Sequence, residues 1–217
     1  NQILACRDLE TYKGHGYEID LTANLTRSWR LMLNYSLPKT QQADIGPGFR
    51  AYAAEHMATW QAGAANPDLP NRARVTTNIN DINRIISGYT QGRTLNNTVD
   101  KIANIYTTYS FREGRVKGLS IGGGANYRGK QVVGNRANQP FAYLYAQPYT
   151  LVSAHSSYDL RFGKVRTRLQ VNVANLLNEK DVVYTAYTSN AAAGGDVPNT
   201  FRYQAPRKYS LTATFNF

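Results

Sequence analysis

The sequence Tyr209-Ser210-Leu211-Thr212-Ala213-Thr214-Phe215-Asn216-Phe217 decides the fold class of this chain. Each odd position carries an apolar or aromatic side chain, and each even position carries a small or polar one. Because the side chains of a β-strand point alternately to its two faces, this stretch predicts a strand with one apolar and one polar face. Such a strand is typical of an outer-membrane β-barrel, which meets lipid on one side and a wet lumen on the other.

Six further segments show the same alternation, which predicts seven strands in all. They cover residues 16–23, 29–37, 99–111, 119–130, 152–162 and 166–173. Strands of roughly ten residues exceed the usual length in soluble proteins, about five or six, and suit a tilted membrane strand. The sequence has no apolar run of about 18 residues that would form a transmembrane helix.

Charged side chains fall on one face of the predicted strands. The polar parity carries Glu18, Asp20, Arg30, Asp100, Arg128, Lys130, Asp159, Arg161, Arg166 and Arg168. The apolar parity is free of charge except near strand ends, as at Lys101 and Arg207. A Lys or Arg facing lipid at the membrane midplane costs about 2–4 kcal/mol, so this distribution favours a membrane barrel. The alternative is a soluble β-sandwich binding module, whose core also excludes charge.

The connections between predicted strands alternate between short and long. Short turns lie at residues 24–27, 112–117 and 163–165, and long connections lie at 38–98, 131–148 and 179–205. Bacterial barrels have short periplasmic turns and long external loops, and single-chain barrels have even strand numbers. Seven strands therefore predict an incomplete barrel that lacks either one strand or a whole N-terminal section.

The first long connection is predicted to contain two helices. Helical spacing relates Tyr52, Ala53, His56, Met57 and Trp60, and again Ile79, Ile82, Ile85 and Ile86. The sequence Asn66-Pro67-Asp68-Leu69-Pro70 separates the two helices. Structureless loops of this length are uncommon, so the connection either binds a ligand or forms a lid over the barrel.

The net charge of +11 is compatible with a nucleic acid, an anionic membrane surface or an anionic solute as partner. The basic residues form no single run, so the charge alone does not decide between these three partners. Because the predicted fold is a membrane barrel, we expect no nucleic-acid partner. His15, His56 and His155 lack metal-ligand spacing, and we predict neither a metal nor a cofactor. An outer-membrane porin or barrel enzyme is a further alternative, but no Ser/His/Asp set supports an enzyme.

Several segments together resemble the C-terminal part of a TonB-dependent outer-membrane receptor. They are Lys13-Gly14-His15-Gly16-Tyr17-Glu18-Ile19-Asp20-Leu21, Trp29-Arg30-Leu31-Met32-Leu33-Asn34-Tyr35-Ser36, Gly118-Leu119-Ser120-Ile121-Gly122-Gly123-Gly124-Ala125-Asn126-Tyr127-Arg128, Val171-Asn172-Val173-Ala174-Asn175-Leu176-Leu177-Asn178-Glu179-Lys180 and the terminal strand. The resemblance implies a 22-stranded barrel plugged by an N-terminal domain, of which residues 1–217 supply the last seven strands without the plug.

The resemblance also implies location, partners and site residues. The receptor would lie in the outer membrane of a Gram-negative-type bacterium and use energy from TonB, through the absent plug, to take up a scarce solute. A basic lumen and loop predict an anionic solute such as a ferric siderophore. We assign solute contacts to Arg72, Arg74 and Arg84, and the assembly signal read by the barrel-assembly machinery to Tyr209, Leu211, Phe215 and Phe217.

Overall fold

The computed structural model describes residues 9–88, 92–136, 139, 141–190 and 195–216. The chain divides into two compact units. The sheet unit comprises His15–Lys39, Asn96–Gly134 and Leu144–Phe217, and the loop unit comprises Asn1–Gly14, Thr40–Leu95 and Asn135–Tyr143. Each unit is described separately below.

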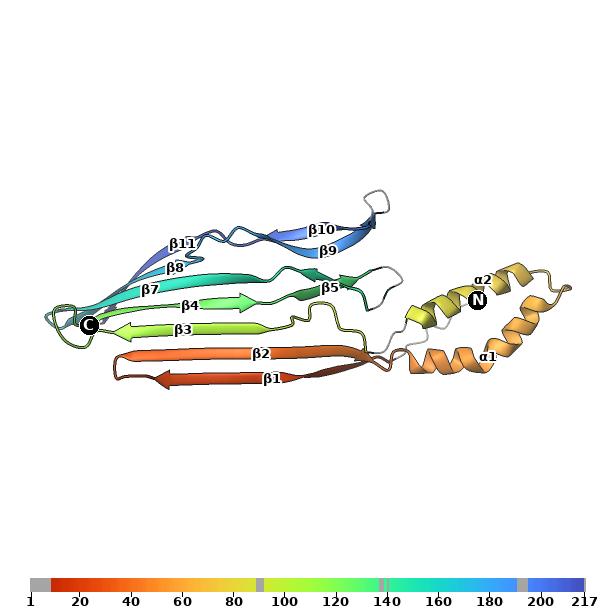
Figure 1. Cartoon of the computed structure of the whole chain (residues 1–217), viewed down its shortest axis with the longest axis horizontal. Helices are drawn as coiled ribbons and strands as arrows, with labels where there is room; N and C mark the ends of the chain where they lie inside the picture. The colour runs from red at the N-terminus through yellow and green to blue at the C-terminus, as the bar shows by residue number, and fades with distance from the viewer. Residues whose placement is uncertain (1–8, 89–91, 137–138, 140, 191–194, 217) are drawn as a thin grey trace. The chain divides into compact units, whose positions relative to one another are not determined.

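The described residues form one seven-stranded sheet in which neighbouring strands follow each other along the chain (Figure 1). The strands, in order, are β1 (Thr11–Asn24), β2 (Trp29–Ala43), β3 (Ile102–Ser110), β4 (Leu119–Arg128), β7 (Tyr149–Phe162), β8 (Val165–Ala174) and β11 (Lys208–Asn216). The recorded pairings from β2 to β11 are all antiparallel. The seven predicted strands are therefore confirmed, and β1 and β11 form the two edges of the sheet.

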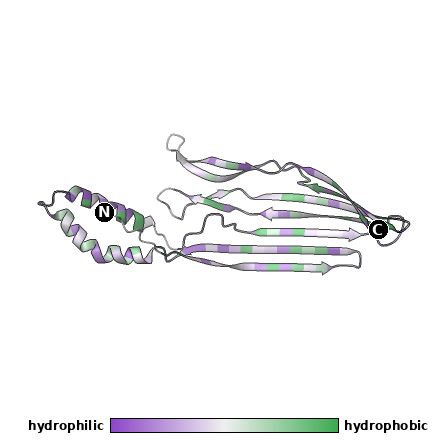
Figure 2. Ribbon diagram, turned by 180° about the vertical axis from the view of Figure 1, so that it is seen from behind, coloured by the Kyte–Doolittle hydropathy of each residue, from purple (hydrophilic) through white to green (hydrophobic). Residues whose placement is uncertain are grey.

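The register confirms the predicted faces. Leu33 lies opposite Ile105, Ile105 opposite Ala125, and Ala125 opposite Val152. Directly opposed residues of an antiparallel pair share a face, so the apolar parities of successive strands combine into one surface. Figure 2 shows the same alternation as bands of contrasting hydropathy along the strands. We call this surface the outward face and the opposite surface the lumenal face.

Strand boundaries differ from the predicted ones. Strand β1 begins at Thr11, and β2 continues past Pro38 to Ala43. The β2 extension is held by backbone pairing with a distant segment: the N–H of Leu95 donates to the carbonyl of Thr40, 3.1 Å away. Strand β3 begins only at Ile102, although Val99 forms an isolated bridge with Gln131. Side-chain alternation does not encode such pairing, which explains the difference.

The second and third long connections contain hairpins that the sequence analysis treats as loops. Strand β5 (Gln131–Asn135) pairs with β6 (Tyr143–Ala146), and β9 (Val182–Asn190) pairs with β10 (Gly195–Tyr203). The register of β9 and β10 is irregular between Pro198 and Phe201, as in a β-bulge. This irregularity interrupts the alternation, so the two strands are hard to recognise from sequence.

The first long connection is confirmed to contain two helices, α1 (Pro47–Ala65) and α2 (Arg72–Gly88). Pro47 begins α1, and the N–H of Asn66 ends it by donating to the carbonyls of Ala62 and Gly63. Ala53 and Ile79 are the buried apolar residues of the two helices. In the part of the chain that the structure describes, neither helix is long and apolar enough to cross a membrane.

Candidate lumenal, loop and membrane-facing surfaces

The outward face of the sheet exposes large apolar side chains. Leu211, for example, is 74% exposed, and Ile19 is 57% exposed. The exposed members are Tyr17, Ile19, Leu21, Trp29, Ile105, Tyr109, Ile121, Leu169, Val171, Tyr209, Leu211 and Phe215. At this parity, the charged residues within the described strands are Lys13 and Lys39, which lie near the ends of β1 and β2 that adjoin the long connections. A continuous apolar surface of this kind marks contact with a membrane or another apolar partner.

Aromatic residues form two rows on the outward face. Toward the short turns, Trp29 lies opposite Tyr109, and the indole N–H of Trp29 donates to Thr107 Oγ1 over 2.7 Å. Toward the long connections, Tyr35 and Tyr127 both lie opposite Ala103, and Tyr209 has the same parity on β11. Aliphatic residues occupy the band between the rows. Aromatic girdles at both borders of an apolar band are characteristic of outer-membrane barrels.

The lumenal face is joined across strands by side-chain hydrogen bonds. The amide of Asn34 donates to Asp20 over 2.6 Å, that of Asn104 to Asn34 over 3.2 Å, and that of Asn126 to Asn104 over 2.7 Å. This amide ladder links four neighbouring strands, β1 to β4. A surface of this polarity is suited to water or to another polar protein surface.

A recess of about 530 Å³ lies farther along the lumenal face. The rings of Tyr106 and His155 stack here with centroids 5.5 Å apart, and the Tyr106 hydroxyl lies 3.2 Å from His155 Nε2. Strand β4 places Gly122 opposite His155 and Gly124 opposite Tyr106. A side chain at Gly122 would collide with His155, so this glycine makes the stack possible.

Arginines gather on the lumenal face near the short turn between β7 and β8. Arg168 forms a two-point ion pair with Asp159, at 2.6 and 2.9 Å. The β7–β8 register supplies this acid, because Asp159 lies directly opposite Arg168. Arg161 lies opposite Arg166, and among the described residues neither has an acidic partner. Like charges in directly opposed positions favour an anionic partner from elsewhere.

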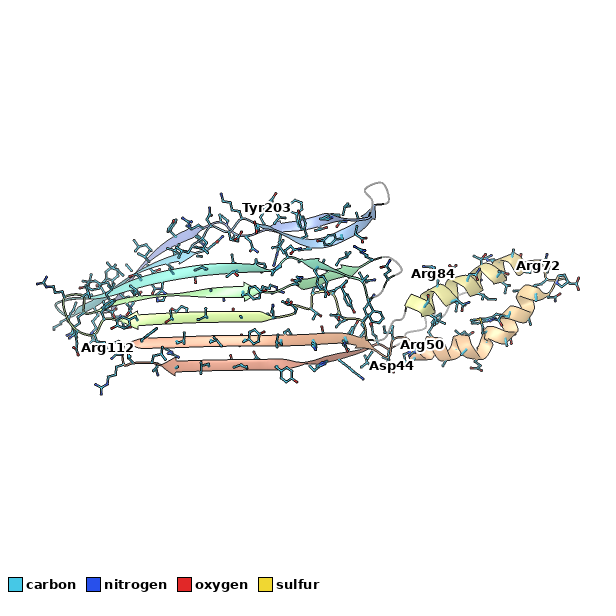
Figure 3. The ribbon with its side chains drawn as sticks, in the orientation of Figure 1. Asp44, Arg50, Arg72, Arg84, Arg112 and Tyr203 are labelled. Carbon is cyan, nitrogen blue, oxygen red and sulfur yellow. The ribbon has the colours of Figure 1, made fainter. Side chains whose placement is uncertain are left out.

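The three arginines predicted to contact solute are not brought together. Arg72 and Arg74 lie in the first turn of α2, whereas Arg84 lies near its other end, as Figure 3 shows for Arg72 and Arg84. Twelve residues of α-helix separate Arg72 from Arg84 by about 18 Å. Arg84 is exposed and lies 3.5 Å from Asp81. The three residues form a spread basic surface and not a single pocket.

His56 has the packing role on α1 that the sequence suggests. Its ring stacks between Tyr52 and Trp60, with centroids 4.2 and 5.8 Å away. Its Nδ1 lies 2.9 Å from the carbonyl oxygen of Tyr52, within hydrogen-bonding distance. In the described ranges, no group of three or more His, Cys, Asp or Glu residues could hold a metal ion.

Polar contacts of tyrosine side chains cluster around the later hairpins, in segments that the sequence predicts as loops. Arg202 donates to the Tyr149 hydroxyl over 3.2 Å and lies 6.0 Å from the centre of that ring. The Tyr187 hydroxyl donates to the carbonyl of Tyr145 over 3.2 Å. Burial and the nearby Tyr184 raise the pKa of Tyr187. The high aromatic content of these segments could have indicated the contacts, but segments predicted as loops are not expected to pack in this way.

Asn175 ties the end of β8 to the segment that precedes β11. It is 6% exposed, and its side-chain amide donates to the carbonyls of Glu179 and Ala205, each over 2.8 Å. Its side-chain oxygen accepts from the N–H of Glu179, also over 2.8 Å. Asn175 has a positive φ of 49°. Asn175 is therefore both a turn residue and a hydrogen-bonding residue, and we call this arrangement the Asn175 clamp.

The predicted assembly signal lies on β11, the edge strand. Tyr209, Leu211 and Phe215 are at least half exposed and lie opposite Val173, Val171 and Thr167 of β8. Phe217 lies outside the described residues. These positions agree with an apolar stripe, but its role in assembly stays a prediction.

Comparisons with known proteins agree with this two-faced sheet. A family model described as TonB dependent receptor-like, beta-barrel, matches residues 10–176. A comparison with curated proteins gives no match.

Three solved receptors are similar in structure. BauA, the ferric preacinetobactin receptor from Acinetobacter baumannii, is 14% identical with a TM-score of 0.59 over 95% of this chain. The pyoverdine outer membrane receptor FpvA from Pseudomonas aeruginosa PAO1 is 17% identical with a TM-score of 0.53 over 95% of this chain. The siderophore receptor PiuA from Acinetobacter baumannii is 17% identical with a TM-score of 0.52 over 94%.

At these identities the likeness establishes the fold alone, and the chain spans only 22% of each of the three receptors. The family match covers more than half of the chain, and it decides against a soluble β-sandwich. The chain therefore belongs to the TonB-dependent receptor β-barrel family, whose members are outer-membrane transporters and not enzymes.

Proposed function

We propose that residues 1–217 form the C-terminal part of a receptor barrel, which further strands and a plug domain of the same protein complete. The observation that carries the proposal is the pairing of a polar lumenal face with an outward face that has charge only near strand ends, on one seven-stranded sheet. Strands β1 and β11 leave unpaired backbone groups, which lipid does not tolerate. The coverage of about one fifth of each similar receptor supports a larger barrel.

The function that this arrangement supports is the uptake of a scarce solute, driven by TonB through the plug. Arg30, Arg128, Arg161 and Arg166 have the lumenal parity, and the chain carries a net charge of +11. A basic lumen attracts an anionic solute, such as a ferric siderophore. Two similar structures support the assignment of this solute class. BauA is a ferric preacinetobactin receptor, and FpvA is a pyoverdine receptor.

Within the loop unit, we assign the first contacts of that solute to Arg72, Arg74 and Arg84. Because they extend over about 18 Å of α2, they act as an attracting surface along which an anion is captured. Arg72 and Arg74 carry no ion pair among the described residues, which leaves both charges available. The barrel-assembly machinery is the proposed partner of β11, and lipid is the partner of the outward face.

The first test separates an energised receptor from a passive porin. Cells that express the intact receptor are given a radiolabelled ferric siderophore in the presence and absence of TonB. We expect binding to the cells in both cases and accumulation only with TonB. Accumulation that continues without TonB would identify a passive pore.

The second test addresses the loop arginines. We expect Arg72→Ala, Arg74→Ala and Arg84→Ala together to slow capture of an anionic siderophore about tenfold at low ionic strength, because steering depends on charge. The matched control replaces Arg27, Arg112 and Arg115 by Ala, which removes the same charge from exposed residues in the short turns. Capture rates that fall equally in both variants would remove α2 from the solute path.

The third test concerns completeness of the barrel. The 217-residue chain alone should aggregate in detergent because both sheet edges are unpaired, whereas the full receptor should refold. Size-exclusion chromatography and circular dichroism distinguish the two outcomes. A monomeric chain that unfolds cooperatively would show that these strands form a structure by themselves.

A further inference from the structure

The loop unit is assembled from three separate stretches of the chain, Asn1–Gly14, Thr40–Leu95 and Asn135–Tyr143. Helices α1 and α2 belong to the second stretch, and Ala53 and Ile79 are their buried apolar residues. Elements with few buried apolar contacts are held weakly by packing. The position of α2 within the unit therefore depends on polar contacts at the base of this stretch.

The side-chain amide of Gln42 lies at the centre of these polar contacts. Its oxygen accepts from Arg93 Nε over 2.9 Å, and its nitrogen donates to Glu10 Oε1. The other carboxylate oxygen of Glu10 accepts from the Tyr12 hydroxyl over 2.8 Å. An amide has one acceptor end and one donor end, so only one orientation of Gln42 serves both charged groups. We call Glu10, Gln42 and Arg93 the Gln42 network.

The backbone at Gln42 closes the base of the stretch that carries the helices. The N–H of Gln42 donates to the carbonyl of Arg93 over 2.9 Å, and the N–H of Gly92 donates to the carbonyl of Gln42 over 2.8 Å. Gln42 is the last residue but one of β2, and Arg93 follows α2 along the chain. The Gln42 network thus lies where the chain leaves for the helices and where it returns.

The same joint reaches the second long connection. Arg93 Nη1 lies 3.5 Å from Asn135 Oδ1, and the N–H of Thr94 donates to the Tyr143 hydroxyl over 2.8 Å. Asn135 and Tyr143 belong to the third stretch of the loop unit. All three stretches therefore meet at Gln42 and Arg93.

We propose that Gln42 and Arg93 are positioning residues for solute capture. The Gln42 network fixes α2, and with it the three arginines proposed to contact solute, relative to the other two stretches of the loop unit. Hydrogen bonds to charged groups are stronger than those between neutral groups, and an amide between a cation and an anion is polarised by both. A preorganised surface loses less entropy when it binds, so a loosened α2 should bind an anion less tightly. The inference rests on the proposed function of those arginines.

The chain offers a matched control in Gln131. Its amide makes the same kind of bridge, because its oxygen accepts from Arg128 Nη2 over 3.1 Å and its nitrogen donates to Asn97 Oδ1 over 2.9 Å. Gln131 is half-buried like Gln42, but it belongs to the sheet unit. Gln42→Met and Gln131→Met therefore remove equivalent amides, and only the first should loosen α2.

An exchange of two residues tests whether the hydrogen bonds themselves are the cause. Gln42→Glu alone places a second carboxylate against Glu10 and should also loosen α2. The double variant Glu10→Gln with Gln42→Glu puts the acid beside Arg93 and the amide on its far side, which restores a donor and an acceptor at each contact of the network. This double variant should behave as the wild type.

The first measurement follows the position of α2 in the intact receptor. Spin labels are attached to Lys13→Cys and Asn83→Cys, two exposed sites of the loop unit, after the native cysteines are replaced by serine. Pulsed electron double resonance should give a narrow distance distribution for the wild type, for Gln131→Met and for the double variant. In Gln42→Met and Gln42→Glu the distribution should be about twice as wide, because fewer contacts hold the base of the stretch.

The second measurement is the affinity of the same variants for the ferric complexes of pyoverdine and preacinetobactin, which are named with FpvA and BauA. Gln42→Met should weaken binding about tenfold, the effect of losing hydrogen bonds to two charged groups. The amount of receptor in the outer membrane should stay normal, whereas a purely structural defect would lower that amount. Gln131→Met and the double variant should bind as the wild type does.

An unchanged distance distribution in Gln42→Met would overturn the inference, as would a wider distribution with unchanged affinity. Equal effects of Gln42→Met and Gln131→Met, or no recovery in the double variant, would also overturn it. A wild type that binds neither ferric complex would refute the proposed function and, with it, the role in capture. The label distances would still decide whether the Gln42 network holds α2, so the two failures are distinguishable.

Discussion

The outward and lumenal faces belong to the same seven strands but meet opposite physical demands. On the outward face, Ile121, Val171 and Leu211 are exposed and make no polar contacts, because lipid takes the place of a protein core. On the lumenal face, neighbouring strands are joined by amides, hydroxyls and the Arg168–Asp159 pair. The lumenal face even accepts Arg161 opposite Arg166, whereas the outward strand positions carry charge only at Lys13 and Lys39, near strand ends. Water or lipid, and not strand propensity, decides which residues each face accepts.

The largest loss of stability is expected from a charge placed in the middle of the outward face. Val171 lies between Ser156 and Leu211 on the outward face, and its neighbour Gln170 has the lumenal parity. Val171→Arg should destabilise the assembled receptor by about 2–4 kcal/mol because the guanidinium enters hydrocarbon. Urea-dependent folding into phospholipid vesicles measures the change.

Gln170→Arg is the control for that prediction, because it introduces the same side chain one residue away. It should fold with nearly wild-type stability and reach the membrane in normal amount. Similar losses at residues 170 and 171 would show that the assigned faces are wrong.

Asn175→Ala should have the next largest effect, about 1–3 kcal/mol. The substitution leaves the N–H of Glu179 and the carbonyls of Glu179 and Ala205 without their buried partner. Asn126→Ala, at the exposed end of the amide ladder, should stay within about 0.5 kcal/mol. Chemical denaturation of the two variants tests whether burial, and not amide chemistry, sets the cost.

Asp159→Asn should cost less than about 1 kcal/mol. The Asp159 and Arg168 side chains are 51% and 55% exposed, so water screens their ion pair. Thermal unfolding in low and high salt measures the contribution, which should shrink as salt increases. A loss of several kcal/mol would mean that the lumenal face is drier in the intact receptor than the exposed pair suggests.

Deletion of Phe217 should change the stability of the folded receptor least. As the proposed assembly signal, Phe217 acts on delivery, so the variant should accumulate as periplasmic aggregates and reach the outer membrane in reduced amount. Refolding of the same variant into detergent should be nearly normal. Equal defects in cells and in detergent would make Phe217 a packing residue.

The faces and the number of main strands could be predicted from sequence because charge marks parity. Glu18, Arg30 and Asp159 each occupy the lumenal parity with apolar or aromatic residues on both sides. The helices could be predicted as well, since Pro47 and the Asn66–Pro70 segment mark their limits. These features depend on neighbours within a few residues.

Features that depend on pairing between distant segments could not be predicted. The extension of β2 requires the backbone of residues 92–95, and the partner of Arg168 follows from the β7–β8 register. Strands β9 and β10 are obscured by the irregular pairing around Pro198. The positions of Arg72, Arg74 and Arg84 along α2 follow from the predicted helix, but nothing in the sequence distinguishes these three from other exposed arginines.

The Asn175 clamp has a consequence for the hairpin of β9 and β10 that it encloses. Because the clamp closes on Glu179 and Ala205, it joins the two ends of the intervening segment at its base, before β9 begins and after β10 ends. The alignment of Lys208 with Ala174 is then set independently of what lies between. A hairpin of another length or composition can be grafted between Asp181 and Gln204 while the membrane-spanning strands keep their pairing.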